Sequence, residues 1–548
     1  MELINNIGTR RYSLVVFLVI SSCLFVAWRL VSTGVADTIS GAIIRGRDDS
    51  QSFAAWKDIA ESRLEDMKER KVFDTLISTR DLVLEKSFPI NWKPCTFAHV
   101  MQERAKTTPN NATVQIVVLG GSATARPGNN CQFDPNDRLS GRYSSHVERG
   151  LNGGQYSTTT NISGTNHSNS LPRIELSNMG QGYTDTSMNA LLMDELVDAE
   201  TADVLIWEFM INEYTKSPKD KARHLDFWLT RVKAHFASVN RRPPPILLLY
   251  FWQVDIAHKP EQIAQNGLDE QPLLRFYGDI IQRYLDFGWD IQVVNVGAAV
   301  NSTVLARNVK YLFDDNHHPG CNGVHLISDL IQHAIYTNLA ATCPTNPPAL
   351  PTEHFPIPAH KEILGDVSPQ WNDLWTDLFR HDARIGSYTP WKPTANITDL
   401  HLANRQAIDE FETYNLGKSS IFRTDRKPGY IIPSCKNAST PPINFVLDEP
   451  DLKWIGLSHD MDNTLRVSIN NMTVKVKDDA SWNIAGKVWF RQWIHLPTRK
   501  VPQADSYTLT LCKRVDAFVG LLHIVAVMLP PNTTDANSTA AAALRGHA

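Results

Sequence analysis

The chain has 548 residues, of which 42% are hydrophobic and 20% charged, and its formal net charge is −4. This is the composition of an ordinary globular protein, and the length allows two or more domains with sizeable cores. A net charge this close to zero, with no long basic run, argues against nucleic acid as a partner.

An apolar run over residues 12–31 follows Arg10 and Arg11. Roughly 17–20 apolar residues are enough for a helix to cross a bilayer, so we expect a transmembrane signal anchor here, after a cytoplasmic tail of residues 1–11. The positive charges before the run predict a single-pass type II membrane protein. Its body would then be luminal or extracellular, in the Golgi or at the cell surface. A cleaved signal peptide ending near residues 34–36 is the alternative.

Two further features indicate an oxidising, glycosylating compartment. Nine Asn-x-Ser/Thr sequons follow the apolar run, at Asn111, Asn161, Asn166, Asn301, Asn396, Asn437, Asn471, Asn532 and Asn537. Of the seven cysteines only Cys23 lies within the run, and the remaining even number fits disulfides. Pairing by the shortest loops gives Cys95–Cys131, Cys321–Cys343 and Cys435–Cys512. Zinc is the competing interpretation, but the sequence has no Cys-x-x-Cys and no closely spaced Cys/His set.

After the apolar run, residues 32–92 are expected to form a stem with charged helical stretches such as Trp56–Arg70. Short apolar runs then alternate with amphipathic stretches in a domain that we place at residues 93–345. The expected strands are Val114–Gly121, Ile174–Met179, Asp203–Ile211, Ile246–Trp252 and Ile291–Val300. The expected helices are Gly141–Leu151, Ser187–Ala199, Lys219–Val239, Gln271–Phe287 and Gly323–Leu339. This alternation predicts a parallel sheet covered on both faces.

The C-terminal part of the chain has a different pattern. A Pro-rich linker is expected at residues 346–390, followed by a β-rich domain at 391–529 and a disordered tail at 530–548. Apolar and polar residues alternate in Leu465–Lys477 and Ser506–Leu511, with turn residues between such runs. The alternation predicts an antiparallel β domain, most simply a sandwich.

The first expected strand ends in Gly120-Gly121-Ser122. A serine directly after the first parallel strand lies where open α/β sheets bind ligands. The glycines permit a tight turn, so that the hydroxyl can face a crevice and the backbone N–H a developing oxyanion. No Lys-Ser/Thr follows, which disfavours a phosphate-binding loop.

A cluster of Asp and His residues precedes the last expected helix. An Asp three residues before a His can reach its ring nitrogen and fix its tautomer, while the other nitrogen faces the serine. Asp315 with His318 has this spacing, as does Asp314 with His317. A metal site and a solvated polar turn are the alternatives.

Donor groups follow the second and third expected strands. Gly182 comes after the second strand and Asn212 after the third. Together they supply a backbone and a side-chain N–H. In an oxyanion hole, each such donor lowers the activation barrier by roughly 3 kcal/mol. Taken singly, Gly182 is a turn residue and Asn212 a helix cap. Their order at successive strand ends favours the catalytic interpretation.

In these four blocks the sequence resembles the SGNH/GDSL hydrolases, over about residues 114–339. The nucleophile block is the Gly-Gly-Ser variant, and Gly180 is an alternative to Gly182 as the donor of the glycine block. The resemblance implies a three-layer α/β/α domain with a five-stranded, flavodoxin-like parallel sheet. The roles that it implies are nucleophile for Ser122, base for His318, orienter for Asp315, and oxyanion hole for the N–H groups of Ser122 and Gly182 with Asn212.

The resemblance implies a serine esterase that needs neither metal nor cofactor. We expect it to remove an acyl group, such as acetyl, from a carbohydrate or a small ester. An O-acyltransferase to a sugar hydroxyl and a non-enzymatic carbohydrate-binding membrane protein are two alternatives. A metal-dependent hydrolase using Asp314, Asp315 and His317 is a third.

Overall fold

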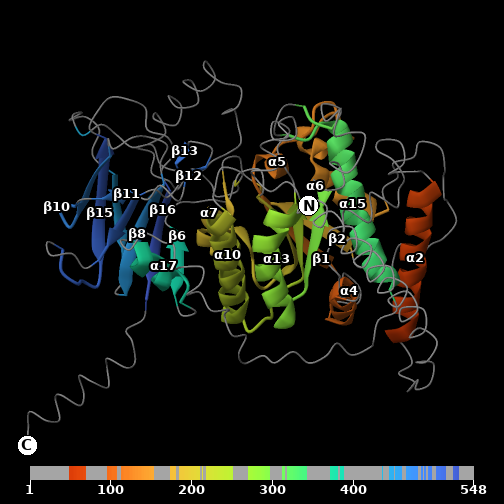
Figure 1. Ribbon diagram of the computed structural model, residues 1–548, viewed down its shortest axis with the longest axis horizontal. Helices are drawn as coiled ribbons and strands as arrows, with labels where there is room; N and C mark the ends of the chain where they lie inside the picture. The colour runs from red at the N-terminus through yellow and green to blue at the C-terminus, as the bar shows by residue number, and fades with distance from the viewer. Residues whose placement is uncertain are drawn as a thin grey trace, which may run out of the picture. The chain divides into compact units, whose positions relative to one another are not determined.

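Figure 1 shows the chain in a computed structural model. The residues that it describes are 49–69, 96–107, 113–153, 173–180, 184–209, 213, 218–250, 270–296, 312–314, 318–341, 371–380, 383–387, 435, 443–449, 451–458, 465–474, 476–478, 483–484, 487–488, 492–496, 501–513 and 523–529. The expected anchor at residues 12–31 lies outside these ranges. Among the described helices, none has both the length and the apolarity of a bilayer span.

Five parallel strands form the central sheet in the order β2-β1-β3-β4-β5. They are β1 (Thr113–Gly120), β2 (Arg173–Asn178), β3 (Ala202–Glu208), β4 (Ile246–Tyr250) and β5 (Ile291–Asn295). This order is that of flavodoxin-like folds, as predicted. Because the order reverses at β1, the carboxyl ends of β1, β2 and β3 meet where such sheets bind ligands.

The helices of this domain fall into two groups on opposite sides of the sheet (Figure 1). One group is α4 (Thr96–Thr107), α6 (Tyr143–Leu151) and α15 (Cys321–Ala340). The other is α7 (Thr186–Leu191), α8 (Met193–Leu196), α10 (Pro218–Ser238) and α13 (Glu270–Asp286). The helix expected at Ser187–Ala199 is thus two short helices, which Leu192 separates.

Burial of the strands explains why a sheet forms between these groups. In β3, Leu205 and Trp207 belong to the hydrophobic core shared with the α10 group, while Val204 and Ile206 point the other way and are also fully buried. Successive residues of a strand face opposite sides, so a run apolar at every position is stable only when helices cover both faces.

The C-terminal strands form two antiparallel sheets, in the orders β10-β9-β15-β7 and β11-β14-β8-β16-β6. One hydrophobic core contains side chains of both sheets, which makes them a sandwich. The strands are β6 (Arg384–Ser387), β7 (Ile443–Leu447), β8 (Leu452–Ser458), β9 (Leu465–Ile469), β10 (Met472–Thr473), β11 (Lys477–Asp478), β14 (Gln492–His495), β15 (Tyr507–Lys513) and β16 (His523–Met528). A separate two-stranded sheet pairs β12 (Asn483–Ile484) with β13 (Lys487–Val488).

The stretch expected as a linker contributes structure to the second domain. Residues 384–387 form β6, an edge strand paired with β16. Just before it, helix α17 (Asn372–Leu378) carries the fully buried Trp375, which contacts His224 and Phe227 of α10. On its other side, Asp377 accepts a hydrogen bond from the Trp454 indole of β8 at 2.8 Å. Helix α17 therefore joins the α/β domain to the sandwich.

The disulfides correct part of the shortest-loop pairing. Cys435–Cys512 is confirmed, but Cys131 pairs with Cys321, across 190 residues of sequence. The pairs Cys95–Cys131 and Cys321–Cys343 are therefore wrong. Loop length does not predict this pairing, because the parallel fold brings the loop after β1 to the start of α15.

Helix α2 (Asp49–Glu69) includes most of the charged stretch expected at Trp56–Arg70. Of the nine sequons, Asn471 lies within the described residues. It is exposed and has a positive φ of 64°, in the turn between β9 and β10. A glycan on this turn would point into solvent.

Candidate functional site

Ser122 is the first residue of the short helix α5 (Ser122–Ala125), directly after β1, and it is half-buried. The Gly121 N–H donates to the Glu208 carbonyl of β3 at 2.9 Å, which ties the turn to the neighbouring strand. Gly120 has no room for a side chain, since a Cβ there would collide with Thr124 and the Glu208 carbonyl. The two glycines of the Gly-Gly-Ser sequence thus let the backbone of this turn pass close to Thr124 and β3.

A buried polar network lies under the serine's helix. The Thr124 hydroxyl is within 2.9 Å of a Glu208 carboxyl oxygen and 2.8 Å of the Tyr143 hydroxyl. All three side chains are at most 2% exposed. They fix the helix that begins with Ser122 to β3 and to α6.

Burial raises the pKa of Glu208 from 4.5 to about 8, and hydrogen bonds from Thr124 and Gly121 offset only part of this effect. Burial is also the main cause that raises the pKa of Tyr143 well above 10, with the charge of Glu208 second. At neutral pH both groups are neutral. The network therefore places no negative charge beside the position where an oxyanion on Ser122 would form.

Asn178, the last residue of β2, holds the glycine block against the serine's helix. Its amide donates to the Thr124 carbonyl at 2.9 Å and to the Ser144 hydroxyl at 2.6 Å. Its side-chain oxygen accepts the Gly180 N–H at 2.9 Å. Because this N–H is already engaged, Gly180 is a poor oxyanion donor, which favours Gly182 for the role.

His318 is half-buried in a tight turn before α15. The Asp314 N–H donates to the His318 carbonyl at 3.0 Å, and an isolated β-bridge pairs Phe313 with Pro319. The Asp314 carboxylate accepts the Asn129 N–H at 2.7 Å, from the loop that follows α5. Asp314 therefore connects the turn that carries His318 to the loop that follows the serine's helix.

Arg126 connects the two candidate catalytic residues. Its backbone N–H donates to the Ser122 carbonyl at 3.0 Å, and its Nη1 lies 3.0 Å from Nδ1 of His318. A guanidinium can only donate, so in this arrangement Nδ1 accepts and the ring proton lies on Nε2. A base that takes the serine proton with Nε2 needs the other tautomer, with its Nδ1–H held by an acceptor. The productive state therefore requires Arg126 to leave Nδ1 to an acceptor such as Asp315.

Glu213, next to Asn212 in the chain, is fully buried. Its carboxylate accepts the Tyr277 hydroxyl at 2.7 Å and the Thr186 N–H at 3.2 Å, and lies 3.8 Å from Nδ1 of His224. Burial and the charge of Glu213 raise the pKa of Tyr277 well above 10. The position after the expected oxyanion donor is therefore held by three surrounding elements, α7, α10 and α13.

Of the predicted site residues, the structure describes Ser122 and His318 and brings their segments together through Arg126 and Asp314. Asp315, Gly182, Asn212 and His317 lie outside the described residues, so their roles stay predictions. The supporting residues Thr124, Asn178, Glu208 and Arg126 were not predicted from the sequence. Asn178 and Glu208 are the last residues of β2 and β3, and polar side chains at strand ends are the signal that could have found them.

Comparison with known proteins gives no matching family and no match among curated sequences. Solved structures do match. A two-domain esterase active on acetylated mannans is 12% identical over 82% of this chain and 99% of its own, with a TM-score of 0.43. A lipase/acylhydrolase from Enterococcus faecalis is 15% identical over 41% of this chain and 96% of its own (TM-score 0.30). An acetylxylan esterase from Geobacillus stearothermophilus is 14% identical over 41% of this chain and 95% of its own, with a TM-score of 0.28. At such identities and TM-scores, these likenesses establish neither a family nor an activity.

Proposed function

We propose that the chain is a serine esterase of the SGNH type that removes an acyl group, such as acetyl, from a carbohydrate. The observation that carries the proposal is the position of Ser122. It begins a short helix at the carboxyl end of β1, and the ends of β2 and β3 are hydrogen-bonded to that turn. His318 lies on the same side, joined to the serine's helix by Arg126.

In the proposed mechanism, His318 takes the proton of the Ser122 hydroxyl as its oxygen attacks the ester carbonyl. The N–H groups of Ser122 and Gly182, with the Asn212 amide, hold the oxyanion. Collapse of the tetrahedral intermediate gives an acyl-serine, and His318 protonates the departing alcohol. Water, deprotonated by His318, then releases the acid and restores the serine.

The setting belongs to the same proposal. An apolar run after two arginines and nine sequons support an anchored protein with its body in the secretory lumen or at the cell surface. Acylated glycans are an ester class found in that setting. The anchor and the location rest on the sequence, as does the choice of carbohydrate.

Fluorophosphonate labelling tests the nucleophile directly, because the reagent bonds covalently to an activated serine. We expect wild type and Ser468→Ala, which changes a serine of β9, to label equally, and Ser122→Ala to lose the label. Equal labelling of Ser122→Ala and wild type would refute the proposed nucleophile.

Acetate release tests the substrate class and the acceptor. The purified chain is incubated with acetylated mannan, acetylated xylan and a small acetyl ester, with and without a deacetylated acceptor glycan. An esterase releases acetate in both conditions. Acetate that appears on the acceptor, with no release when the acceptor is absent, would identify an acyltransferase instead.

A further inference from the structure

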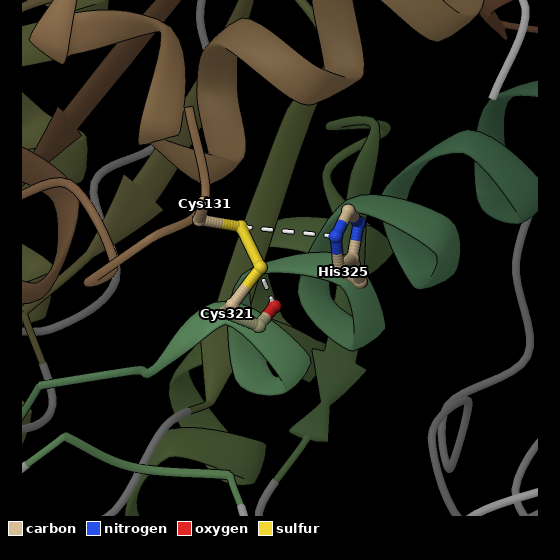
Figure 2. A group of neighbouring side chains, drawn as sticks. All are labelled: Cys131, Cys321 and His325. Carbon is tan, nitrogen blue, oxygen red and sulfur yellow. Dashed lines mark hydrogen bonds between the residues drawn. A yellow bond between two sulfur atoms is a disulfide. The ribbon is translucent and has the colours of Figure 1, made fainter. Parts of the chain in front are cut away.

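Two sulfurs and two imidazoles meet beside the site, at the junction of three segments. Cys131 comes from the loop after α5, His146 from α6, and Cys321 and His325 from the first turns of α15. Figure 2 shows the Cys131 sulfur directed at the His325 ring, with Cys321 bonded to Cys131. The proposed esterase chemistry uses none of these side chains.

The distance between one sulfur and one imidazole of this group is that of two metal ligands. Nε2 of His325 lies 3.7 Å from Sγ of Cys131, and the donor atoms of Cys131, Cys321 and His325 all lie within 4.8 Å of one another. Tetrahedral zinc with Zn–S of about 2.3 Å and Zn–N of about 2.0–2.1 Å separates a sulfur and a nitrogen ligand by about 3.6 Å. The sulfur of Cys131 and Nε2 of His325 are therefore already as far apart as two ligands of one zinc ion.

His146 of α6 lies next to the Cys131 sulfur and the His325 ring. Its Nε2 lies 3.7 Å from Sγ of Cys131 and 2.9 Å from the Cys131 carbonyl oxygen. Its ring also packs edge-on against His325, with 4.8 Å between ring centroids. The cluster thus holds a second imidazole next to the same sulfur.

The helices that carry the two histidines are held at a fixed distance. A Cβ at Gly150 of α6 would collide with Gln332 of α15, and the Tyr336 hydroxyl donates to the Gly150 carbonyl at 3.0 Å. Cys321 and His325 are four residues apart and so share one face of α15. The ligand groups are therefore positioned by packed helices, which metal sites require.

We propose that Cys131, Cys321 and His325 form a zinc site when the disulfide is reduced. The same two sulfurs would then either bond to each other or bind the metal. Thiolate and imidazole together suit zinc and its analogue cobalt better than calcium or magnesium, which prefer oxygen ligands. Cys321 is the first residue of a 20-residue helix, where the macrodipole favours a thiolate.

The interconversion balances with a thiol reductant. A dithiol reduces the Cys131–Cys321 bond by thiol–disulfide exchange. The reductant becomes a disulfide, and Cys131 and Cys321 become thiols. Zinc then displaces one proton from each thiol on binding. Reoxidation returns two electrons to an oxidised dithiol, re-forms the S–S bond and expels the ion.

Cobalt binding tests the site in the full-length chain. The protein is reduced with a phosphine under argon, freed of reductant and titrated with Co²⁺. We expect visible d–d bands and thiolate-to-cobalt charge-transfer bands that saturate at one equivalent and disappear when Zn²⁺ is added. The oxidised protein should give no such bands. Absence of charge-transfer bands in the reduced wild type would overturn the proposal.

Variants assign the signal to these residues. Cys131→Ser and His325→Ala should each weaken cobalt binding at least tenfold, while Cys435→Ser, which removes a thiol of the other described cysteine pair, should leave it unchanged. Equal binding by Cys131→Ser and Cys435→Ser would refute the assignment.

Thiol alkylation gives a second measurement that needs no variant. In the reduced wild type, Zn²⁺ should slow the alkylation of Cys131 and Cys321 at least tenfold, as read from their peptides by mass spectrometry. Cys435 and Cys512 should react at the same rate with and without zinc. Unchanged alkylation of Cys131 and Cys321 would contradict the proposal, whatever the variants do.

Discussion

The α/β domain and the sandwich bury different kinds of side chain. In the described part of the sandwich, residues 443–529, Gln492 is the one polar side chain that is buried. In the α/β domain, Thr124, Glu208, Glu213 and His224 are all at most 2% exposed, and they lie around the carboxyl ends of the strands. Burying polar groups costs free energy unless each is hydrogen-bonded.

This difference indicates where the chemistry lies. The interior of the sandwich is almost entirely apolar, with Leu, Ile and Val from both sheets. The α/β domain retains buried carboxyl and hydroxyl groups under a serine turn, where they fix its position. Substitutions at matched residues of the two domains can test this contrast.

The largest expected effect is that of His318→Ala on turnover. Loss of the base should lower kcat by about 10⁶-fold, because removal of a triad member leaves only binding and the oxyanion hole. The matched control is His495→Ala in β14 of the sandwich, an exposed histidine, which should keep kcat within about twofold. Steady-state kinetics on an acetyl ester measure both. A kcat for His318→Ala within tenfold of wild type would remove His318 from the mechanism.

Trp375→Ala should lower the free energy of unfolding by about 3–5 kcal/mol, since it removes a fully buried indole between α10 and the sandwich. Val446→Ala, whose side chain is 57% exposed on β7, should change it by less than about 0.5 kcal/mol. Urea denaturation followed by fluorescence and circular dichroism measures the difference. If Trp375→Ala were as stable as Val446→Ala, α17 would not join the two domains.

Glu208 gives the stability of the α/β domain a pH dependence. Its pKa is about 8 when folded against 4.5 for the ordinary group, so between these values the folded state keeps a proton that the unfolded chain releases. Stability therefore falls as the pH rises from about 4.5 to about 8, by up to roughly 1.4 kcal/mol per pKa unit. Glu208→Gln should flatten this decline. Parallel curves for wild type and Glu208→Gln across this window would show that the buried carboxyl is not protonated.

The regular elements and the position of Ser122 at the end of β1 could be predicted because they depend on local patterns. The central strands contain apolar runs, as in Ile246–Tyr250 of β4, and a period of two in Leu465–Ile469 predicts β9 of the sandwich. Ser122 and His318 stand out because Gly121 permits a tight turn before the serine, while Pro319 restricts the backbone after the histidine.

Other features depend on contacts across the fold. The Cys131–Cys321 bond spans 190 residues, and Arg126 reaches His318 over a similar separation. Neither contact has a signal in local sequence. The proposed zinc site was missed because Cys131 comes from a distant segment, although Cys321 and His325, four residues apart in the sequence, are a closely spaced Cys/His pair.

Asn178→Ala should have the smallest effect and gives the most direct test of the polar network. Asn178 touches the Thr124 carbonyl, the Ser144 hydroxyl and the Gly180 N–H, and none of these contacts involves the reacting atoms. It is thus a positioning residue, and a shift of about 1 Å in the serine turn can cost about 10²-fold in rate.

For Asn178→Ala we therefore expect kcat to fall about 10–100-fold while KM changes less than about threefold. Asn178→Asp should recover part of this loss, because its carboxylate can still accept the Gly180 N–H. The matched control is Asn444→Ala in β7, which loses an exposed hydrogen bond from Thr510 and should behave as wild type. If Asn178→Ala raised KM and left kcat intact, the residue would bind substrate instead of holding the turn, and the buried network would not serve to position Ser122.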